Sequence, residues 1–139
     1  MANTFRLRIV SNNRVFYDDK AVSLLFTASD GVYQIMAHHA PMNIAVEIGD
    51  IKVQKEDGTW ISAVVSQGFI EVANNRVNMF VFSCEKPEEI DVLRAQEAKE
   101  RAEEQLRQKQ SMMEYHHSKI SLARAMARLR AAQRESKGL

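Results

Sequence analysis

The character of the sequence changes within residues 85–101, EKPEEIDVLRAQEAKER. Pro87 suits the first position of a helix, because the backbone N–H of that position has no intrahelical acceptor in any case. Glu88, Glu89 and Asp91 follow, and the positive end of the helix dipole favours negative charges in a first turn. We therefore expect a helical unit to begin in this stretch.

The residues before this point have the pattern of short strands separated by turns. Residues 5–9, FRLRI, alternate strictly, so their apolar side chains should face a core. Asp18-Asp19 is expected to turn the chain between two separate strands, Asn74-Asn75 to form another turn, and Asp57-Gly58 is typical of a β-hairpin. With about ten strands this short, the prediction is a β-sandwich or flattened barrel.

After Pro87 the apolar spacing becomes helical, with apolar residues, mostly alanines, recurring at intervals of three and four. These residues are Ala95, Ala98, Ala102 and Leu106, and then Ile120, Ala123, Ala127 and Ala131. Ser111 and Glu114 match a capping box that would start a second helix. The predicted fold is therefore α+β, with a β-sandwich domain at 1–85 and an antiparallel helical hairpin at 86–139. Alanines bury little surface, at about 0.8 kcal/mol per CH₂, so the hairpin should be held weakly.

Charge differs between the two expected helices. Residues 85–107 carry more acidic than basic residues, whereas residues 115–139 carry six lysines and arginines against the single Glu135. The basic helix should be attracted to its acidic neighbour, or equally to an acidic surface elsewhere. A weakly held hairpin with a second partner is a candidate conformational switch.

Overall composition excludes several classes of protein. Nineteen basic and eighteen acidic residues give a net charge of +1, which argues against nucleic-acid binding. Cys84 is the only cysteine and has no partner for an internal disulfide. No apolar run approaches the roughly 20 residues of a membrane span, and no signal-peptide pattern is seen. We expect a cytoplasmic protein without direct membrane insertion.

Few residues point to catalysis. His38, His39 and Glu47 invite a metal site, but their spacing matches no common metal motif, and loop contacts or solvated histidines are favoured. His116-His117 is most simply part of a polar helix face. The sequence shows no nucleophilic triad and no glycine-rich phosphate loop, so catalysis by this chain is not expected.

Four arginines would meet if the two helices fold together. Those on the first helix are seven residues apart and those on the second are four apart, so each pair shares a face. Together they would suit a polyphosphate, and nearby carboxylates could accept from an adenine amino group or a ribose hydroxyl. The residues are Arg94, Arg101, Arg124 and Arg128, with Asp91 and Glu85. Spacing alone favours the alternative, in which solvated arginines pair with nearby glutamates.

Several motifs follow one another in a fixed order along the chain. They are FRLRIV (5–10), HAP (39–41), GFIEV (68–72), NRV (75–77), IDVLRA (90–95) with AKERAEE (98–104), and ARAMARLR (123–130). From about Phe5 to Arg134 the chain thereby resembles the epsilon subunit of the bacterial F-type ATP synthase.

The resemblance implies a non-catalytic subunit at the cytoplasmic face of the membrane, in the central stalk. Its sandwich would bind the gamma subunit, and also the membrane rotor ring through loops near Asp30 and His39. Its hairpin would either lie folded or extend into the catalytic head, where it blocks rotation and inhibits ATP hydrolysis. The basic second helix would then contact the catalytic alpha and beta subunits.

The resemblance also implies a ligand. In some bacterial members the folded hairpin binds ATP through an Ile/Leu-Asp-x-x-Arg-Ala motif. The corresponding residues of this chain are Ile90, Asp91, Arg94 and Ala95, with Glu85 upstream and Arg101, Arg124 and Arg128 completing the set. On this resemblance no cofactor is expected to be required, and ATP would be a regulatory ligand.

The chain departs from the family pattern in the sandwich. Gln34, Met36-Ala37 and His38 stand where the family usually has a glycine, an aliphatic–proline pair and a further glycine, and Gln67 also replaces a glycine. These changes concern the loops expected to meet the rotor ring. Two other classes remain open: a free-standing adaptor with a helical protein-binding arm, and a metal enzyme using His38, His39 and Glu47.

Overall fold

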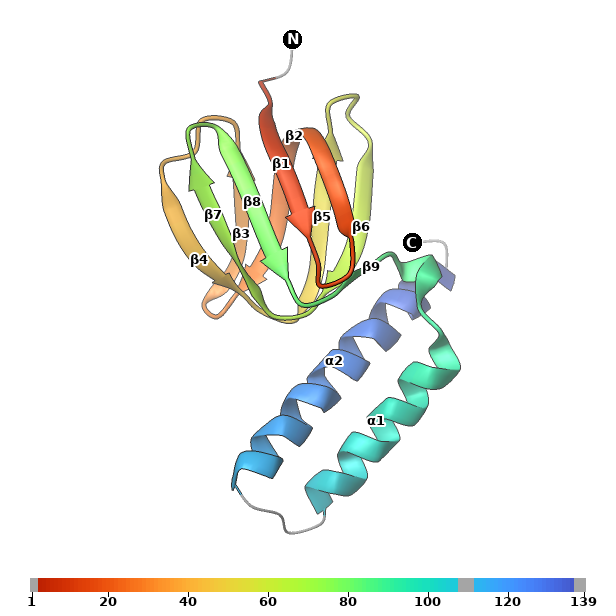
Figure 1. Ribbon diagram of the computed structural model, residues 1–139. Helices are drawn as coiled ribbons and strands as arrows, with labels where there is room; N and C mark the ends of the chain where they lie inside the picture. Colours follow the sequence, from red (N-terminus) through yellow and green to blue (C-terminus); the bar gives the residue numbers. More distant parts are fainter. Residues whose placement is uncertain (1–2, 108–111, 137–139) are drawn as a thin grey trace. The chain divides into compact units, whose positions relative to one another are not determined.

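The computed structural model describes residues 3–107 and 112–136, and the chain divides into two compact units after Glu85 (Figure 1). The first unit is a β-sandwich of nine strands and the second contains two helices, which confirms the predicted fold class with nine strands instead of about ten. The strands are β1 (Phe5–Val10), β2 (Val15–Ala28), β3 (Gly31–Met36), β4 (Met42–Val46), β5 (Gly49–Lys55), β6 (Trp60–Val65), β7 (Gly68–Ala73), β8 (Arg76–Val81) and β9 (Cys84–Glu85).

Strand β2 joins the two layers of the sandwich. Its first half pairs with β1, which continues the order β4-β7-β8-β1, and β1 and β8 run parallel. Its second half lies between β3 and β5, from which the sheet continues through β6 to β9. A strand of 14 residues is long enough to belong to both layers.

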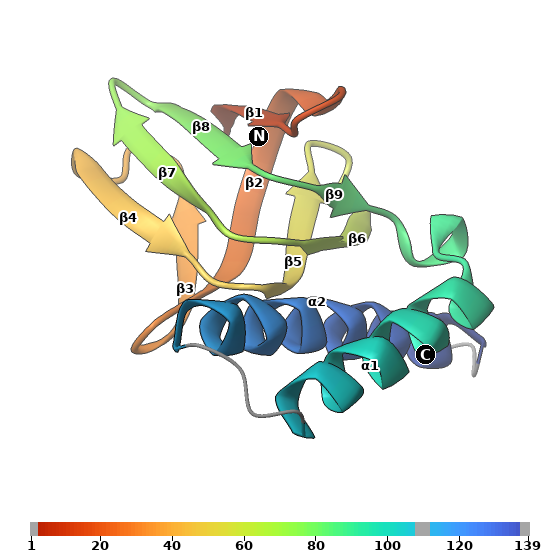
Figure 2. The same cartoon turned by 60° about the horizontal axis from the view of Figure 1, so that its bottom comes forward.

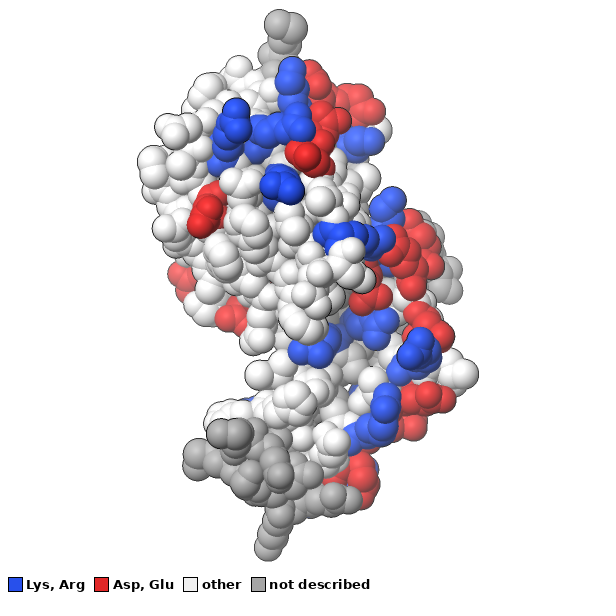
Figure 3. Space-filling model, in the orientation of Figure 1, with Lys and Arg blue, Asp and Glu red and all other residues white. Residues whose placement is uncertain are grey.

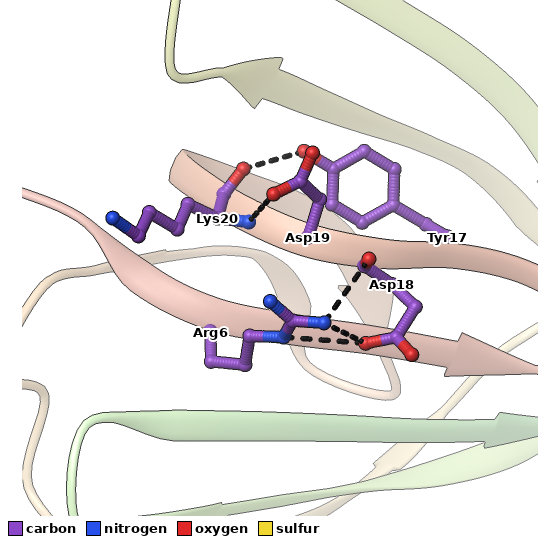
Figure 4. Close-up of polar contacts among 5 residues, drawn as sticks. All are labelled: Arg6, Tyr17, Asp18, Asp19 and Lys20. Carbon is purple, nitrogen blue, oxygen red and sulfur yellow. Dashed lines mark hydrogen bonds and ion pairs between the residues drawn. The ribbon is translucent and has the colours of Figure 1, made fainter.

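The turn predicted at Asp18-Asp19 is wrong, because β2 runs straight through these residues. Asp18 lies opposite Arg8 on β1, and its carboxylate accepts from the Arg6 guanidinium at 2.7 Å (Figure 4). The Tyr17 hydroxyl donates to the Lys20 carbonyl at 2.6 Å, and burial raises the pKa of Tyr17. A cross-strand partner thus holds Asp18 inside the strand, while Asp19 Oδ1 accepts from the Lys20 backbone N–H of the same strand.

The core lies between the layers and follows the predicted alternation. Phe5, Leu7 and Ile9 of β1 are at most 2 % exposed, whereas Arg6 and Arg8 are exposed. Tight turns connect the strands where glycine and asparagine adopt positive φ. Asn74 and Asn75 have φ values of 52° and 59° and join β7 to β8, as the sequence predicts.

The second unit contains a short 3₁₀ turn (Pro87–Glu89), α1 (Val92–Arg107) and α2 (Met112–Ser136). The two helices pack along one another (Figures 1 and 2). On α1 the predicted stripe is correct at Ala95 and Ala102, which are buried. On α2 the predicted stripe is correct at Ala127 and Ala131, which are buried, and wrong at Ala123, which is exposed. Ala125 and Leu129, outside the predicted stripe, are also buried. The predicted capping box falls on Ser111 and Glu114, outside the residues and side chains that the structure describes.

Candidate functional site

The α-helix of this unit begins at Val92, more than one turn after the predicted start at Pro87. Pro87 opens the 3₁₀ turn, which Ile90 ends in an extended conformation, so Glu88 and Glu89 precede α1. Asp91 then caps α1: its Oδ1 accepts from the Arg94 backbone N–H at 3.1 Å. Aspartate is a favoured N-cap, whereas the Lys86 side chain makes no capping bond, and this explains where the α-helix starts.

A groove of about 330 Å³ runs between α1 and α2. Its apolar lining comes from three alanines, Ala98 and Ala102 on α1 and Ala125 on α2. Because these side chains are small, longer polar side chains can border the groove from both helices. The polar lining residues are Arg101, Gln105, His117, Ser121, Arg124 and Arg128.

The structure brings three of the four predicted arginines together in this groove. Arg101 comes from α1, and Arg124 and Arg128 come from α2. Arg94 instead lines a second groove on α1, of about 610 Å³, which also contains Arg101. The arrangement of guanidinium groups in the first groove suits an anion, because each offers several N–H donors to phosphate oxygens.

Of the remaining predicted residues, Ile90, Asp91 and Ala95 line neither groove. Ile90 and Ala95 are buried at the start of the helical unit, and the Asp91 carboxylate caps α1. Glu85 is the last residue of β9 and belongs to the first unit. The first groove is therefore lined by three of the four arginines that were predicted to meet, and by none of Glu85, Ile90, Asp91 and Ala95.

Acidic residues on α1 gather on the second groove, which Glu97, Glu100 and Glu104 line. Glu104 accepts from Arg107 at 2.8 Å, and this hydrogen bond and the negative charge raise the pKa of Arg107. Basic and acidic side chains also lie close together along the helices in Figure 3. This ion pair involves Arg107, which is not one of the four arginines predicted to meet, so it does not test the alternative left open above.

A polar contact links the helices beside the first groove. The Ser118 hydroxyl, on a residue that is 2 % exposed, donates to Gln105 Oε1 at 3.1 Å. Ser118 is not among the residues predicted from the sequence. Its spacing was a usable signal, because it lies seven residues before the buried Ala125 and so on the same helical face.

The histidines of the sandwich do not form a metal site. His38 adopts a positive φ of 62°, and its backbone N–H donates to Asn75 Oδ1, while His39 Nδ1 contacts the Ala40 carbonyl. Within residues 3–107 and 112–136, no three His, Cys, Asp or Glu residues are placed to hold a metal ion. The turn near Asp30 and the loop at His39 lie at opposite ends of β3.

No helix in the described part of the chain is both long enough and apolar enough to cross a membrane.

Two structural relatives share this fold. A chain of the Euglena gracilis mitochondrial ATP synthase superposes with a TM-score of 0.79 and 20 % identity, covering 96 % of this chain and 83 % of that one. A chain from the central stalk of the Tetrahymena thermophila mitochondrial ATP synthase gives a TM-score of 0.68 and 9 % identity, covering 95 % and 99 %. At these identities the likeness shows the fold.

Sequence comparisons place the chain in a family. The ATP synthase Delta/Epsilon chain beta-sandwich domain matches residues 4–87, and the Delta/Epsilon chain long alpha-helix domain matches residues 88–133. The ATP synthase epsilon chain of Ruminiclostridium cellulolyticum is 44 % identical, covering 94 % of this chain and 97 % of that protein. That of Caldanaerobacter subterraneus subsp. tengcongensis is 39 % identical, covering 96 % and 97 %. The chain therefore belongs to the ATP synthase epsilon chain family, whose members are non-catalytic subunits of the central stalk.

Proposed function

We propose that this chain couples the membrane rotor ring of an F-type ATP synthase to the catalytic head and regulates ATP hydrolysis. Residues 1–85 form the rotor-binding domain, and residues 86–139 form the regulatory hairpin. The family membership and the division into two compact units after Glu85 support this assignment. The subunit is peripheral, at the cytoplasmic face of the membrane.

The sandwich binds the gamma subunit and the rotor ring. The turn near Asp30 and the loop at His39 make separate contacts, because β3 holds them about 20 Å apart at roughly 3.3 Å per residue. The Asp30 carboxylate also accepts from the Tyr33 hydroxyl at 2.7 Å, which orders its side chain. Cysteines placed one at a time at Asp30 and His39 should therefore cross-link to different subunits or different parts of the ring.

The basic helix α2 provides the contact with the catalytic subunits. Arg130 and Arg134 are exposed, and so is Lys119. An acidic surface of the alpha and beta subunits would attract them when the hairpin extends. Removal of the chain after Lys86 should then increase ATP hydrolysis by the assembled enzyme. Unchanged hydrolysis, with assembly intact, would show that the hairpin does not inhibit.

ATP binds the folded hairpin and stabilises it. The observation that carries this proposal is the groove in which Arg101 from α1 meets Arg124 and Arg128 from α2. Extension of the hairpin separates the helices and dismantles the groove, so the ligand favours the folded state by RT ln(1 + [L]/Kd).

Calorimetric titration with ATP tests the site on its own. Arg124→Gln should weaken ATP binding by roughly tenfold or more, because a hydrogen bond between charged groups contributes about 1.5–3 kcal/mol. Arg130→Gln is the matched control, since Arg130 is exposed on the same helix and does not line the groove. Absence of heat with the wild type at millimolar ATP, or equal losses in both variants, would overturn the nucleotide proposal.

The adaptor alternative predicts a different behaviour of the native protein. A rotor subunit should purify with a large membrane-bound complex, whereas an adaptor should purify alone or with other partners.

A further inference from the structure

The sandwich ends in a strand with very little pairing of its own. Strand β9 is two residues long and pairs with β6 through Cys84 opposite Val65 and Glu85 opposite Val64. Most strands have about five or six residues, so two residue pairs are a weak attachment. The next residue, Lys86, is the first of the helical unit. We call residues 82–85 the exit segment.

One set of contacts to the exit segment comes from Ser66. Its backbone N–H donates to the Ser83 carbonyl at 3.1 Å. Its hydroxyl oxygen accepts from the Ser83 backbone N–H at 2.9 Å and from the Ser83 hydroxyl at 3.1 Å. Ser66 is 2 % exposed, so water competes little for these hydrogen bonds. They hold Ser83, the residue that precedes β9.

A second set of contacts comes from the turn between β1 and β2, residues 11–14. The Asn12 backbone N–H donates to the Phe82 carbonyl at 3.2 Å. Arg14 Nη2 donates to the Cys84 carbonyl at 2.9 Å, and this bond is partly buried. The first of these bonds holds the start of the exit segment, whereas the second reaches β9 itself.

The Arg14 guanidinium is positioned for this bond by its own surroundings. The Ser11 backbone N–H and hydroxyl donate to the Arg14 carbonyl at 2.8 and 3.2 Å, which closes the turn. The guanidinium carbon lies 5.7 Å from the centre of the Phe16 ring, within the range of a cation–π interaction. Because turn and ring already restrict the side chain, the bond to Cys84 costs less conformational entropy than one from a freely moving arginine.

We propose that Arg14 holds β9 in the sandwich and thereby sets the length of the linker between the two units. When the bond to the Cys84 carbonyl opens, β9 separates from β6 and residues 84–85 join the linker. Two extended residues add about 7 Å of reach, at roughly 3.3–3.6 Å per residue. The use of this reach in regulation rests on the proposed function, whereas the attachment of β9 by Arg14 does not.

Cys84 reports whether β9 is attached, because it is the only cysteine of the chain and is 3 % exposed. In the full chain, Arg14→Gln should increase the rate at which the Cys84 thiol reacts with dithionitrobenzoate by about tenfold, since it removes a hydrogen bond from a charged donor. Arg14→Lys keeps a cationic donor and should stay within about threefold of the wild type. Arg8→Gln is the matched control, because Arg8 is an exposed arginine of the same sandwich and lies opposite Asp18.

Cleavage after Glu85 by a glutamate-specific protease tests the length of the linker, because a protease needs a mobile stretch of chain around the cleaved bond. Arg14→Gln should be cleaved there faster than Arg8→Gln, by a factor similar to that for the thiol. Urea unfolding of each variant distinguishes separation of β9 from loss of the whole sandwich. The unfolding midpoint of Arg14→Gln should equal that of Arg8→Gln.

Faster thiol reaction and faster cleavage in Arg14→Gln, at an unchanged urea midpoint, support the proposal. Equal thiol rates in Arg14→Gln and Arg8→Gln overturn it. A faster rate that a lower urea midpoint accounts for also overturns it, since Arg14 would then stabilise the whole sandwich. Faster thiol reaction without faster cleavage overturns the effect on linker length. Failure of the proposed function is recognised separately, by ATP hydrolysis that does not change when the chain after Lys86 is removed.

Discussion

The Ser118 hydroxyl on α2 donates a hydrogen bond of 3.1 Å to Gln105 Oε1 on α1. The residue that donates is 2 % exposed, while Gln105 is exposed at the border of the anion groove. Most other contacts between helices this rich in alanine contribute little each, because a methyl group buries little surface. One partly buried hydrogen bond is therefore a substantial part of what holds the hairpin closed.

Ser118→Ala should destabilise the closed hairpin by about 1 kcal/mol, the usual net contribution of one hydrogen bond. Hydrogen exchange of the α1 and α2 amides without ligand measures the change. Ser121→Ala is the control, because it makes the same substitution in the same helix without removing a bond between the helices. Equal exchange rates in the two variants would show that the Ser118–Gln105 bond contributes nothing.

Asp91→Ala should fray the first turn of α1, at a cost of about 1 kcal/mol, because it removes the N-cap on the Arg94 N–H. Asp91→Asn should preserve the cap, since asparagine caps equally well. Exchange of the Arg94 and Ala95 amides reports the fraying. If Asp91→Asn frays as much as Asp91→Ala, the carboxylate charge matters more than the capping bond. Nucleotide titration of Asp91→Asn then measures any role in ligand binding without a change in helix structure.

The helical unit shows what spacing can and cannot predict. Ala95 and Ala102 lie seven residues apart among longer side chains, so the pattern identifies the buried face of α1. Alanines at many positions of α2 fit several faces equally, so the pattern includes the buried Ala127 and Ala131 but also Ala123, which is exposed. The sequence places three arginines of the groove on compatible faces, but His117 and Ser121 become recognisable only when α1 is set beside them.

Gly68→Ala should destabilise the sandwich by about 1–3 kcal/mol or more, as overpacking does. A Cβ at Gly68 would lie 1.9 Å from the Phe80 carbonyl oxygen, which is backbone of the neighbouring strand and cannot move aside. Gly49→Ala is the control, because the nearest atom there is the Thr27 Oγ1 at an ordinary 3.6 Å. Urea unfolding of both variants measures the difference. Similar midpoints for the two would contradict the close approach.

The strands show a different limit of prediction. Alternation identifies the buried face of β1, because successive side chains of a strand point to opposite faces of the sheet and the apolar ones face the core. The continuity of β2 through Asp18 depends on Arg6, which lies twelve residues earlier. The Arg6 guanidinium donates to the Asp18 carboxylate. No local pattern contains that partner, so two aspartates in a row predict a turn.

Acid should weaken the β5–β6 hairpin through Asp57. Hydrogen bonds from the Thr59 hydroxyl at 2.6 Å and the Thr59 backbone N–H at 3.0 Å lower the pKa of Asp57 from its ordinary 3.8. A lowered pKa in the folded state means that the stabilisation is complete above the pKa of the unfolded chain, near pH 4, and is lost as the pH falls through the folded value.

Thr59→Val removes the hydroxyl donor and keeps the backbone N–H, so the Asp57 pKa should rise toward 3.8 and the loss of stability below pH 4 should become smaller. NMR titration of the Asp57 carboxyl measures the pKa, and urea unfolding between pH 2 and pH 7 measures the stability. Above pH 5 the wild type should be more stable than the variant, and the difference should shrink with acid as the carboxylate of the wild type becomes protonated. A stability difference that stays constant across this range would show that the Thr59 hydroxyl acts through packing and not through the charge of Asp57.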